Sequence, residues 1–331
     1  MHVVCLGVMK ALLGSWIKVK NRNYSLQQND IRKLNTEFQS IARYIPRDLC
    51  RKPRDLKEID CFKATEFRQF LLYTGQVVLK DILSEERYIH FLQLSLAMRI
   101  LLNAEDCVQN NKCAEERIKD FLLRVPVLYD DLMLTYNCHC LSHLARDSKH
   151  FGSLETTSAF NFENKLGKIK KLVKKNNNVP SQIYNRLVEQ SLHGNHHTNI
   201  VSKKSTIQSD GIYKFVKTKN FYLSSIAPEN FYLVQKLIFK LISISRSADN
   251  DFVLHGLRVQ DLHNLYNKPL QSSLFNIYRA ENLSFNKTPN HHTLDEVTSK
   301  CLCFYTRSSY IFVPLIADHV AEQSQLHRRP H

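Results

Sequence analysis

Residues 62–102 read FKATEFRQFLLYTGQVVLKDILSEERYIHFLQLSLAMRILL, and they decide the fold of the first half of the chain. The stretch holds two apolar segments, residues 62–83 and 85–102, which are separated by Ser84. Each segment is too long for an ordinary strand and too apolar all round for a helix on the surface. The pattern therefore predicts two helices that are packed among other helices.

The sequence on both sides continues this helical pattern. In residues 28–45, apolar side chains recur at spacings of three and four, as on one face of a helix. Residues 114–125 predict a helix that ends before Pro126, and residues 129–149 continue in the same manner. The opening stretch, residues 1–20, is interrupted by Lys10 and is too short for a membrane span. We expect it to form a buried helix, although its basic residues also suit an organellar presequence.

The composition of the sequence changes around residues 176–211, which are polar and rich in turn-forming residues. One more helix is predicted over residues 181–192, and β-branched and aromatic segments separated by Asn, Pro, Ser and Asp follow. Residues 230–244, NFYLVQKLIFKLISI, fit either a helical or a strand period. We predict an α+β fold with a mostly helical part over 1–192, a linker over 193–211 and a small β-rich domain over 212–331.

Composition narrows the class of protein. The chain has 331 residues, is 43% hydrophobic and has 8 glycines and 9 prolines, so it can bury a sizeable core. Its formal net charge of +15 favours a polyanionic partner, and a solvated basic surface is the plainer alternative. The odd number of cysteines, 9, suits a reducing compartment. We therefore expect a nuclear or cytoplasmic protein that is not secreted and has no membrane partner.

The segment SAFNFENKLGKIKKLVKK, residues 158–175, carries much of the positive charge. On a helical wheel over residues 162–175, Phe162, Leu166, Ile169, Leu172 and Val173 share one arc. The opposite arc is basic, and we predict that it binds the phosphate backbone of DNA. Its members are Lys168, Lys170, Lys171, Lys174 and Lys175.

Glu163 is the one carboxylate at the head of this basic segment. The positions three and four residues further on are Leu166 and Gly167, so a helical ion pair is excluded. Either Glu163 is a solvated acid near a helix start, which the helix dipole favours, or it holds a divalent metal beside a bound phosphate. A two-metal site needs several carboxylates, and one glutamate does not suffice.

Three strings carry a resemblance to a known family: MHVVCLGVMKALL, CRKPRDLKEIDCFKATEFRQFLLYTGQVVLKDIL and YNCHCLSHLARDSKHFGSLETTSAFNFENKLGKIKKL. They resemble transposase-derived proteins of the CACTA-like (En/Spm) kind found in animal genomes. The resemblance runs from Met1 to about Leu192 and continues more weakly to the FVPLI string, residues 312–316. These motifs are long and ordered, which makes them more specific than a single short motif.

The resemblance implies an RNase H-like core with an Asp, Asp, Glu triad, in which Glu163 is the third acid and a metal ligand. Residues 28–130 would then be a helical insertion, and Met1 and His2 the end of an Asp-x-x-His element whose acid precedes the chain. The family uses Mg or Mn for two-metal cleavage and strand transfer of DNA. Since both Asp residues are absent, we expect an N-terminally truncated chain that binds no such metal and does not cut DNA alone.

Several His and Cys residues invite other hypotheses. Cys138, His139, Cys140 and His143 are all zinc-ligand types, but their spacing matches no common zinc motif. By the resemblance, His139 and His143 lie on one helical face near the acid, as candidate catalytic residues. We expect solvated loops around the histidines at 193, 196, 197, 291 and 292, and buried thiols at Cys301 and Cys303 on a strand.

A basic loop, PRDLCRKPRDLKEID over residues 46–60, includes Arg51, Lys52 and Arg54. The planar guanidinium groups of Arg51 and Arg54 suit phosphate, and these two residues, together with Lys52 beside Arg51, are further candidates for DNA contact. DNA is thus the expected partner, and self-association is a further hypothesis. Three alternatives stay open: an inert transposase remnant, a non-catalytic module that binds DNA or protein, and a helical scaffold unrelated to transposases.

Overall fold

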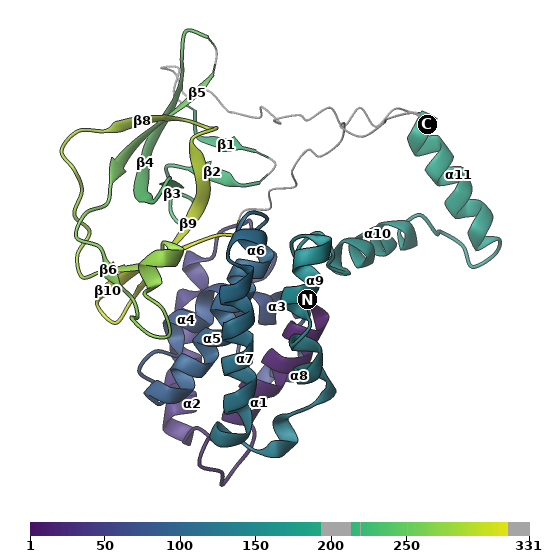
Figure 1. The fold of residues 1–331 in the computed structure, drawn as a ribbon. Helices are drawn as coiled ribbons and strands as arrows, with labels where there is room; N and C mark the ends of the chain where they lie inside the picture. The colour runs from purple at the N-terminus through teal and green to yellow at the C-terminus, as the bar shows by residue number, and fades with distance from the viewer. Residues whose placement is uncertain (193–212, 219, 250, 317–331) are drawn as a thin grey trace, which may run out of the picture.

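The chain is an α+β protein, as predicted, with helices in its first part and antiparallel strands in its second (Figure 1). This computed structural model describes residues 1–192, 213–218, 220–249 and 251–316. The predicted linker, residues 193–211, lies outside the described residues. Within residues 1–192 the backbone forms helices and turns and contains no strand.

The helical part begins with a π-helix, η1 (Val3–Met9), which runs on into α1 (Lys10–Ile17). This confirms the buried helix expected at the start of the chain, since the side chains of Cys5, Leu13 and Trp16 have no exposed surface. The helices that follow are α2 (Gln28–Ser40), η2 (Ile41–Tyr44), η3 (Leu56–Cys61), α3 (Ala64–Gln69), η4 (Phe70–Thr74), α4 (Gly75–Val78), α5 (Glu85–Leu102), α6 (Asp106–Gln109), α7 (Asn111–Leu128), η5 (Asp131–Met133), α8 (Tyr136–Leu141), α9 (Leu144–Phe151), α10 (Phe160–Lys170) and α11 (Val179–Leu192).

The observed helices correct two predicted boundaries. Helix α7 passes through Pro126 and ends at Leu128, because a proline in the last turn removes only one backbone hydrogen bond. The basic helix predicted over residues 162–175 ends at Lys170, and the next residues form turns with hydrogen bonds to the third residue back. Helix α5, by contrast, has the predicted bounds.

The β part resolves the ambiguity of residues 230–244 in favour of strands. They form a hairpin of β3 (Phe231–Val234) and β4 (Leu237–Arg246), with Gln235 in the turn at a φ of 55°. The other strands are β1 (Phe215–Lys217), β2 (Tyr222–Ser224), β5 (Phe252–Arg258), β6 (His263–Asn264), β7 (Tyr278–Ala280), β8 (Asn290–Thr293), β9 (Val297–Thr306) and β10 (Ser309–Pro314); a 3₁₀ turn, η6 (Ser272–Phe275), precedes β7.

Eight strands form one antiparallel sheet in the order β6-β7-β10-β9-β3-β4-β5-β8, and β1 pairs with β2. The sheet lies over one end of the helices, whereas α10 and α11 extend sideways from them (Figure 1). We call residues 160–192, which contain these two helices, the arm.

The helical and β parts share one hydrophobic core. Leu302, Phe304 and Val313 of the sheet belong to the same buried cluster as Trp16 and Phe91 of the helices. Polar contacts reinforce this junction. The guanidinium of Arg99, which is 7% exposed, donates to the carbonyls of Leu72 at 3.0 Å and of Pro314 at 2.9 Å. The hydroxyl of Tyr266 donates to the Gln76 side chain at 3.0 Å.

Candidate functional site

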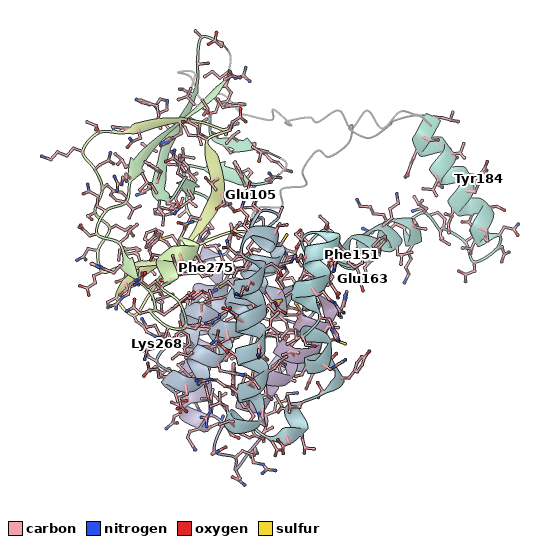
Figure 2. The ribbon with its side chains drawn as sticks, in the orientation of Figure 1. Glu105, Phe151, Glu163, Tyr184, Lys268 and Phe275 are labelled. Atoms are coloured by element: carbon pink, nitrogen blue, oxygen red, sulfur yellow. The ribbon has the colours of Figure 1, made fainter. Side chains whose placement is uncertain are left out.

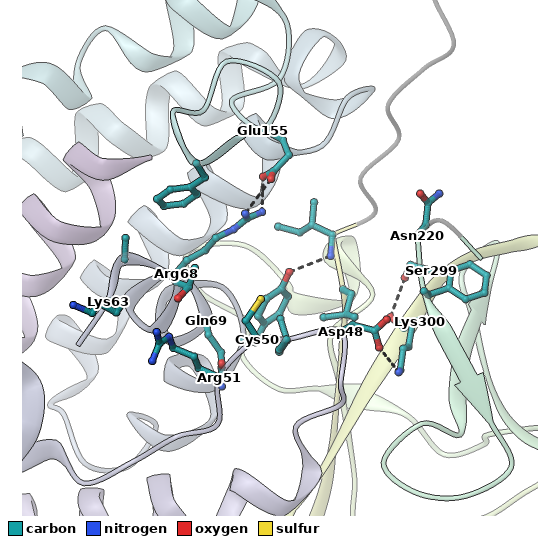
Figure 3. A pocket seen from close by; sticks show the side chains of 18 of the residues that line it. Asp48, Cys50, Arg51, Lys63, Arg68, Gln69, Glu155, Asn220, Ser299 and Lys300 are labelled. Carbon is teal, nitrogen blue, oxygen red and sulfur yellow. Dashed lines mark hydrogen bonds and ion pairs between the residues drawn. The ribbon is translucent and has the colours of Figure 1, made fainter. Parts of the chain in front are cut away.

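A cavity of about 720 Å³ lies at the junction between the helical and β parts. Its helical wall comes from η1, the basic loop, α3 and the start of α10, and its other wall from β9 and the segment after β10 (Figure 3). A volume of this size is typical of small-ligand sites. We call it the junction cavity. It is lined by His2, Leu6, Asp48, Leu49, Cys50, Arg51, Lys63, Ala64, Thr65, Arg68, Gln69, Tyr73, Glu155, Phe160, Glu163, Asn220, Phe221, Val297, Thr298, Ser299, Lys300, Leu315 and Ile316.

Glu163 reaches this cavity from the first turn of α10. Its Oε1 lies 3.0 Å from Nε2 of His2, and the His2 ring packs edge-on against Phe160, with centroids 4.7 Å apart. Glu163 has no ion-pair partner among the described residues of its own helix, and its partner His2 instead comes from the start of the chain. The Glu163 side chain is 61% exposed, and so solvent screens this pair.

Two further carboxylates of the cavity are held by cations. Glu155 accepts two hydrogen bonds from the Arg68 guanidinium, at 3.1 and 2.5 Å. Asp48 accepts from the ammonium of Lys300, a residue that is 1% exposed. The same ammonium also contacts the Glu229 carboxylate and donates to the Tyr222 carbonyl at 2.7 Å. This buried cluster links the basic loop to strand β9.

The residues present do not fit the Mg or Mn site that the family resemblance implies. These cations prefer several oxygen ligands, but Glu155 and Asp48 are each engaged by a cation and Glu163 by an imidazole. Among the residues that the structure describes, no three His, Cys, Asp or Glu side chains are grouped to hold a metal. We therefore assign no metal-dependent step to this cavity.

Three polar side chains of the helical wall have no ion-pair or hydrogen-bond partner of this kind among the described residues. Gln69 is 5% exposed, and no hydrogen bond to its side-chain amide is formed by any described residue. Arg51 and Lys63 are exposed, and neither side chain forms an ion pair within the described ranges. Figure 3 shows all three among the residues that line the cavity.

The other candidates of the basic loop have different surroundings. Arg54 is committed to structural contacts, since its guanidinium donates to Glu66 and Glu58 at 2.7 Å each and to the Cys61 carbonyl at 2.8 Å. Lys52 is exposed and does not line the junction cavity. Of the three predicted DNA contacts in this loop, the structure places Arg51 in the cavity.

The five lysines predicted to bind DNA lie on the arm and are all exposed. Lys168 and Lys170 belong to α10, while Lys171, Lys174 and Lys175 lie in the connection to α11. The Gln182 side chain orders this connection, because its oxygen accepts from the backbone amides of Lys174 and Lys175 at 3.0 and 3.1 Å. No ion pair from the described part of the chain neutralises these lysines.

The apolar face of the arm is also exposed. The exposed fractions are 69% for Phe162, 63% for Leu166 and 68% for Tyr184. Figure 2 shows the side chain of Tyr184 on α11, away from the body of the molecule. The body of its own chain therefore leaves this face uncovered.

His139 and His143 contact each other and do not line the junction cavity. Their Nε2 atoms are 3.2 Å apart, and Arg146 approaches Nδ1 of His143 at 3.4 Å. Cys138 is 6% exposed, and its thiol donates to the Met133 carbonyl at 3.2 Å. The four-ligand zinc hypothesis therefore has no support in the geometry.

The histidines of the second half are only partly as predicted. His291 and His292 lie in strand β8 and not in a loop, and His292 is buried against the Tyr232 hydroxyl at 3.0 Å. The histidines at 193, 196 and 197 lie outside the described residues. All nine cysteines are unpaired. Cys301 and Cys303 pack in one apolar cluster of the sheet, where Cys301 is buried as expected and Cys303 is partly exposed.

Comparisons with known proteins add one match. A family model described as a domain of unknown function (DUF8592) matches residues 195–315, which include the whole described β part. Neither the curated proteins nor the solved structures give a match. None of the helices in the described ranges is long and apolar enough to cross a membrane.

The sequence alone did not reveal most of this cavity. Gln69, Arg68 with Glu155, and Lys300 with Asp48 come from distant segments, and their contacts depend on the tertiary fold. One signal was present: Lys300 is a single charge at the head of an apolar strand, KCLCFYT. A buried lysine needs carboxylate partners, which points to a buried ion pair.

Proposed function

We propose that this chain is a transposase-derived module that binds DNA through the phosphate backbone, with the arm as its main contact. The observation that carries the proposal is the placement of five exposed, unneutralised lysines on an arm that starts at the rim of the junction cavity. Lysines in this state release counterions when they meet phosphates. The proposal covers binding and does not extend to the cleavage chemistry of the family.

Two observations support the link to the transposase family. His2 and Glu163, which the resemblance marks as motif residues, lie 3.0 Å apart in one cavity although they are far apart in the sequence. Glu163 also lies in the first turn of the arm, before the five lysines, so a DNA backbone bound by these lysines would run toward that cavity. A DNA partner and nine unpaired cysteines suit a nuclear or cytoplasmic location.

The test is duplex DNA binding by the purified chain across a salt series. We expect log K to fall steeply with log salt. The variant Lys170→Glu, Lys171→Glu, Lys174→Glu should flatten this slope by about one for each phosphate that its side chains no longer neutralise. A matched control changes Lys33, Lys236 and Lys287 to Glu, which are exposed lysines of the body. Equal slopes for the two variants would exclude the arm as the surface that binds DNA.

A second candidate function, protein binding by the arm, is favoured by its uncovered apolar face. If the arm docks on a protein, Phe162→Ser with Leu166→Ser should abolish that complex and leave the salt slope of DNA binding unchanged. A second copy of the chain is the first partner to examine, by sedimentation of the wild type and this variant.

A further inference from the structure

The side-chain amide of Gln69 is the unusual feature of the junction cavity. The residue is 5% exposed, it lines the cavity, and no described residue gives its amide a hydrogen bond. The amide atoms do not belong to the solvent-inaccessible, unpaired polar atoms of the described residues, so they face the open space of the cavity. The amide is therefore placed to bond with whatever occupies the cavity.

The charges of the cavity divide into engaged and available groups. Arg68 is engaged by Glu155 and Lys300 by Asp48, and Glu163 pairs with His2. Arg51 and Lys63, on the same wall as Gln69, have no acidic partner in the described part of the chain. An anion that approaches this wall thus meets two available cations, whereas the exposed Glu163 carboxylate, whose partner is an imidazole, lies at the arm side of the cavity. A guanidinium suits phosphate in particular, since it donates two parallel hydrogen bonds.

The remaining lining is apolar and partly aromatic. Phe160 lies at the arm side of the cavity and Phe221, which is 9% exposed, at the sheet side. Leu6, Val297 and Leu315 add aliphatic surface. Aromatic side chains stabilise a nucleobase by stacking, by about 1 to 3 kcal/mol per base.

We propose that the junction cavity takes one unpaired nucleotide of the DNA strand that the arm binds. The base would lie among the apolar side chains, with its polar edge on the Gln69 amide, and the phosphate would remain at the rim on Arg51 and Lys63. This inference rests on the proposed DNA-binding function and names the part of the ligand that the cavity accepts. An amide carries both a donor and an acceptor, which is the pattern that base edges present.

Other occupants fit less well. Inorganic phosphate alone would use Arg51 and Lys63 but would leave the Gln69 amide and the apolar wall without a partner. A divalent cation lacks available carboxylates here, because those of Glu155 and Asp48 are already engaged. A purely apolar ligand would leave the amide unsatisfied.

The test is titration of the full chain with dAMP, deoxyadenosine and inorganic phosphate, followed by NMR. We expect dAMP to bind more tightly than either of the others. Gln69→Met, which keeps the volume and removes the amide, should weaken dAMP and deoxyadenosine by about tenfold, the loss of one to two hydrogen bonds. Arg51→Met should weaken dAMP and leave deoxyadenosine unchanged. Lys236→Met, on the exposed turn of the β3–β4 hairpin, is the matched control.

Two outcomes would overturn the inference: dAMP and phosphate binding with equal affinity, or a folded Gln69→Met chain that binds dAMP like the wild type. If Gln69→Met does not fold, Arg51→Met decides, because Arg51 is exposed and its loss does not endanger folding. The salt series on duplex DNA is a separate measurement. If the chain does not bind dAMP, but its affinity for duplex DNA still falls steeply with salt and depends on the arm lysines, then the cavity inference is refuted and the proposed DNA-binding function is not.

Discussion

At the scale of single residues, Lys300 has the largest expected effect on stability. Its ammonium is fully buried between the carboxylates of Asp48 and Glu229. Replacing it with Met leaves Asp48 without its cation, and leaves the buried Glu229 with the Arg47 guanidinium at 3.4 Å as its remaining cationic partner among the described residues. We expect Lys300→Met to lower the free energy of unfolding by about 3 to 5 kcal/mol, as measured by urea denaturation. Lys236→Met, at an exposed site, should stay within about 0.5 kcal/mol of the wild type.

His90 makes the stability of the chain depend on pH. The ring is fully buried, with Nε2 3.0 Å from the Phe121 carbonyl and Nδ1 3.3 Å from the Tyr129 hydroxyl, and burial lowers the pKa of His90 to about 4. The unfolded chain takes up this proton near pH 6.5 and the folded chain only near pH 4. Stability from this group is complete above about pH 6.5 and is lost as the pH falls toward 4, by about 3 kcal/mol in all.

Urea denaturation between about pH 4 and about pH 7.5 checks this prediction. His90→Gln should flatten the dependence over that range, since a glutamine cannot take up the proton. His150→Gln, on the exposed end of α9, should leave it as in the wild type. Identical pH profiles for His90→Gln and the wild type would contradict the assignment.

Residue-level prediction from the sequence is limited to chemistry that is local along the chain. The sequence singles out Glu163 because no neighbour on its helix neutralises it; the structure places this residue at the junction cavity, and its catalytic role stays a prediction. Its partner His2, the amide of Gln69 and the engagement of Arg54 by Glu66 were missed, because each depends on side chains brought together by the fold. Charge and spacing along the chain do not contain that information.

At the scale of elements, hydrophobic periodicity predicted most helices, and competing local effects set their ends. Helix α5 is buried over most of its surface, so its apolar run alone fixed its bounds. In the arm, packing does not support the basic segment after Lys170, and the Gln182 side chain instead holds it in turns. The β3–β4 hairpin needed tertiary context, because its apolar pattern satisfied both periods.

In the sheet, the backbone of Gly256 lies very close to the Tyr232 side chain, so a substitution at Tyr232 should restore stability that is lost by a substitution at Gly256. A Cβ atom added to Gly256 would clash with the Tyr232 hydroxyl oxygen, so β5 tolerates no side chain there. We expect Gly256→Ala to cost about 1 to 3 kcal/mol through this clash. In that background Tyr232→Phe should recover stability, although alone it costs about 1 kcal/mol by removing the hydrogen bond to His292. Urea denaturation of the two single variants and the double variant checks this. If the loss of stability in the double variant equals the sum of the two single losses, Tyr232→Phe does not relieve the clash.

At the scale of the whole molecule, the helical and β parts should unfold together because they share one core. Trp16 is the only tryptophan of the chain and lies fully buried in the helical part. Its fluorescence and the far-UV circular dichroism should therefore report the same urea midpoint. Lys300→Met, a change in the sheet, should shift both midpoints equally. An unshifted Trp16 transition would mean that the parts unfold independently.

The sequence predicted an α+β chain but not this shared core. Composition and turn residues indicate where helices give way to strands, whereas they do not show whether two segments bury surface against each other. Residues such as Arg99, which bonds carbonyls of both parts, look in the sequence like an ordinary charge within an apolar helix. Its two acceptors lie on segments far apart in the chain.

The shared core also has a consequence for biosynthesis. Strand β10 supplies Ile311 and Val313 to the cluster that contains Trp16, but about 160 residues separate it from the end of α9. At about 5 to 20 residues per second, the ribosome needs roughly 10 to 30 seconds to translate that interval. During this time the helices up to α9 have emerged while part of their apolar covering has yet to be made. We therefore expect the nascent chain to expose this apolar surface until its last strand has been synthesised.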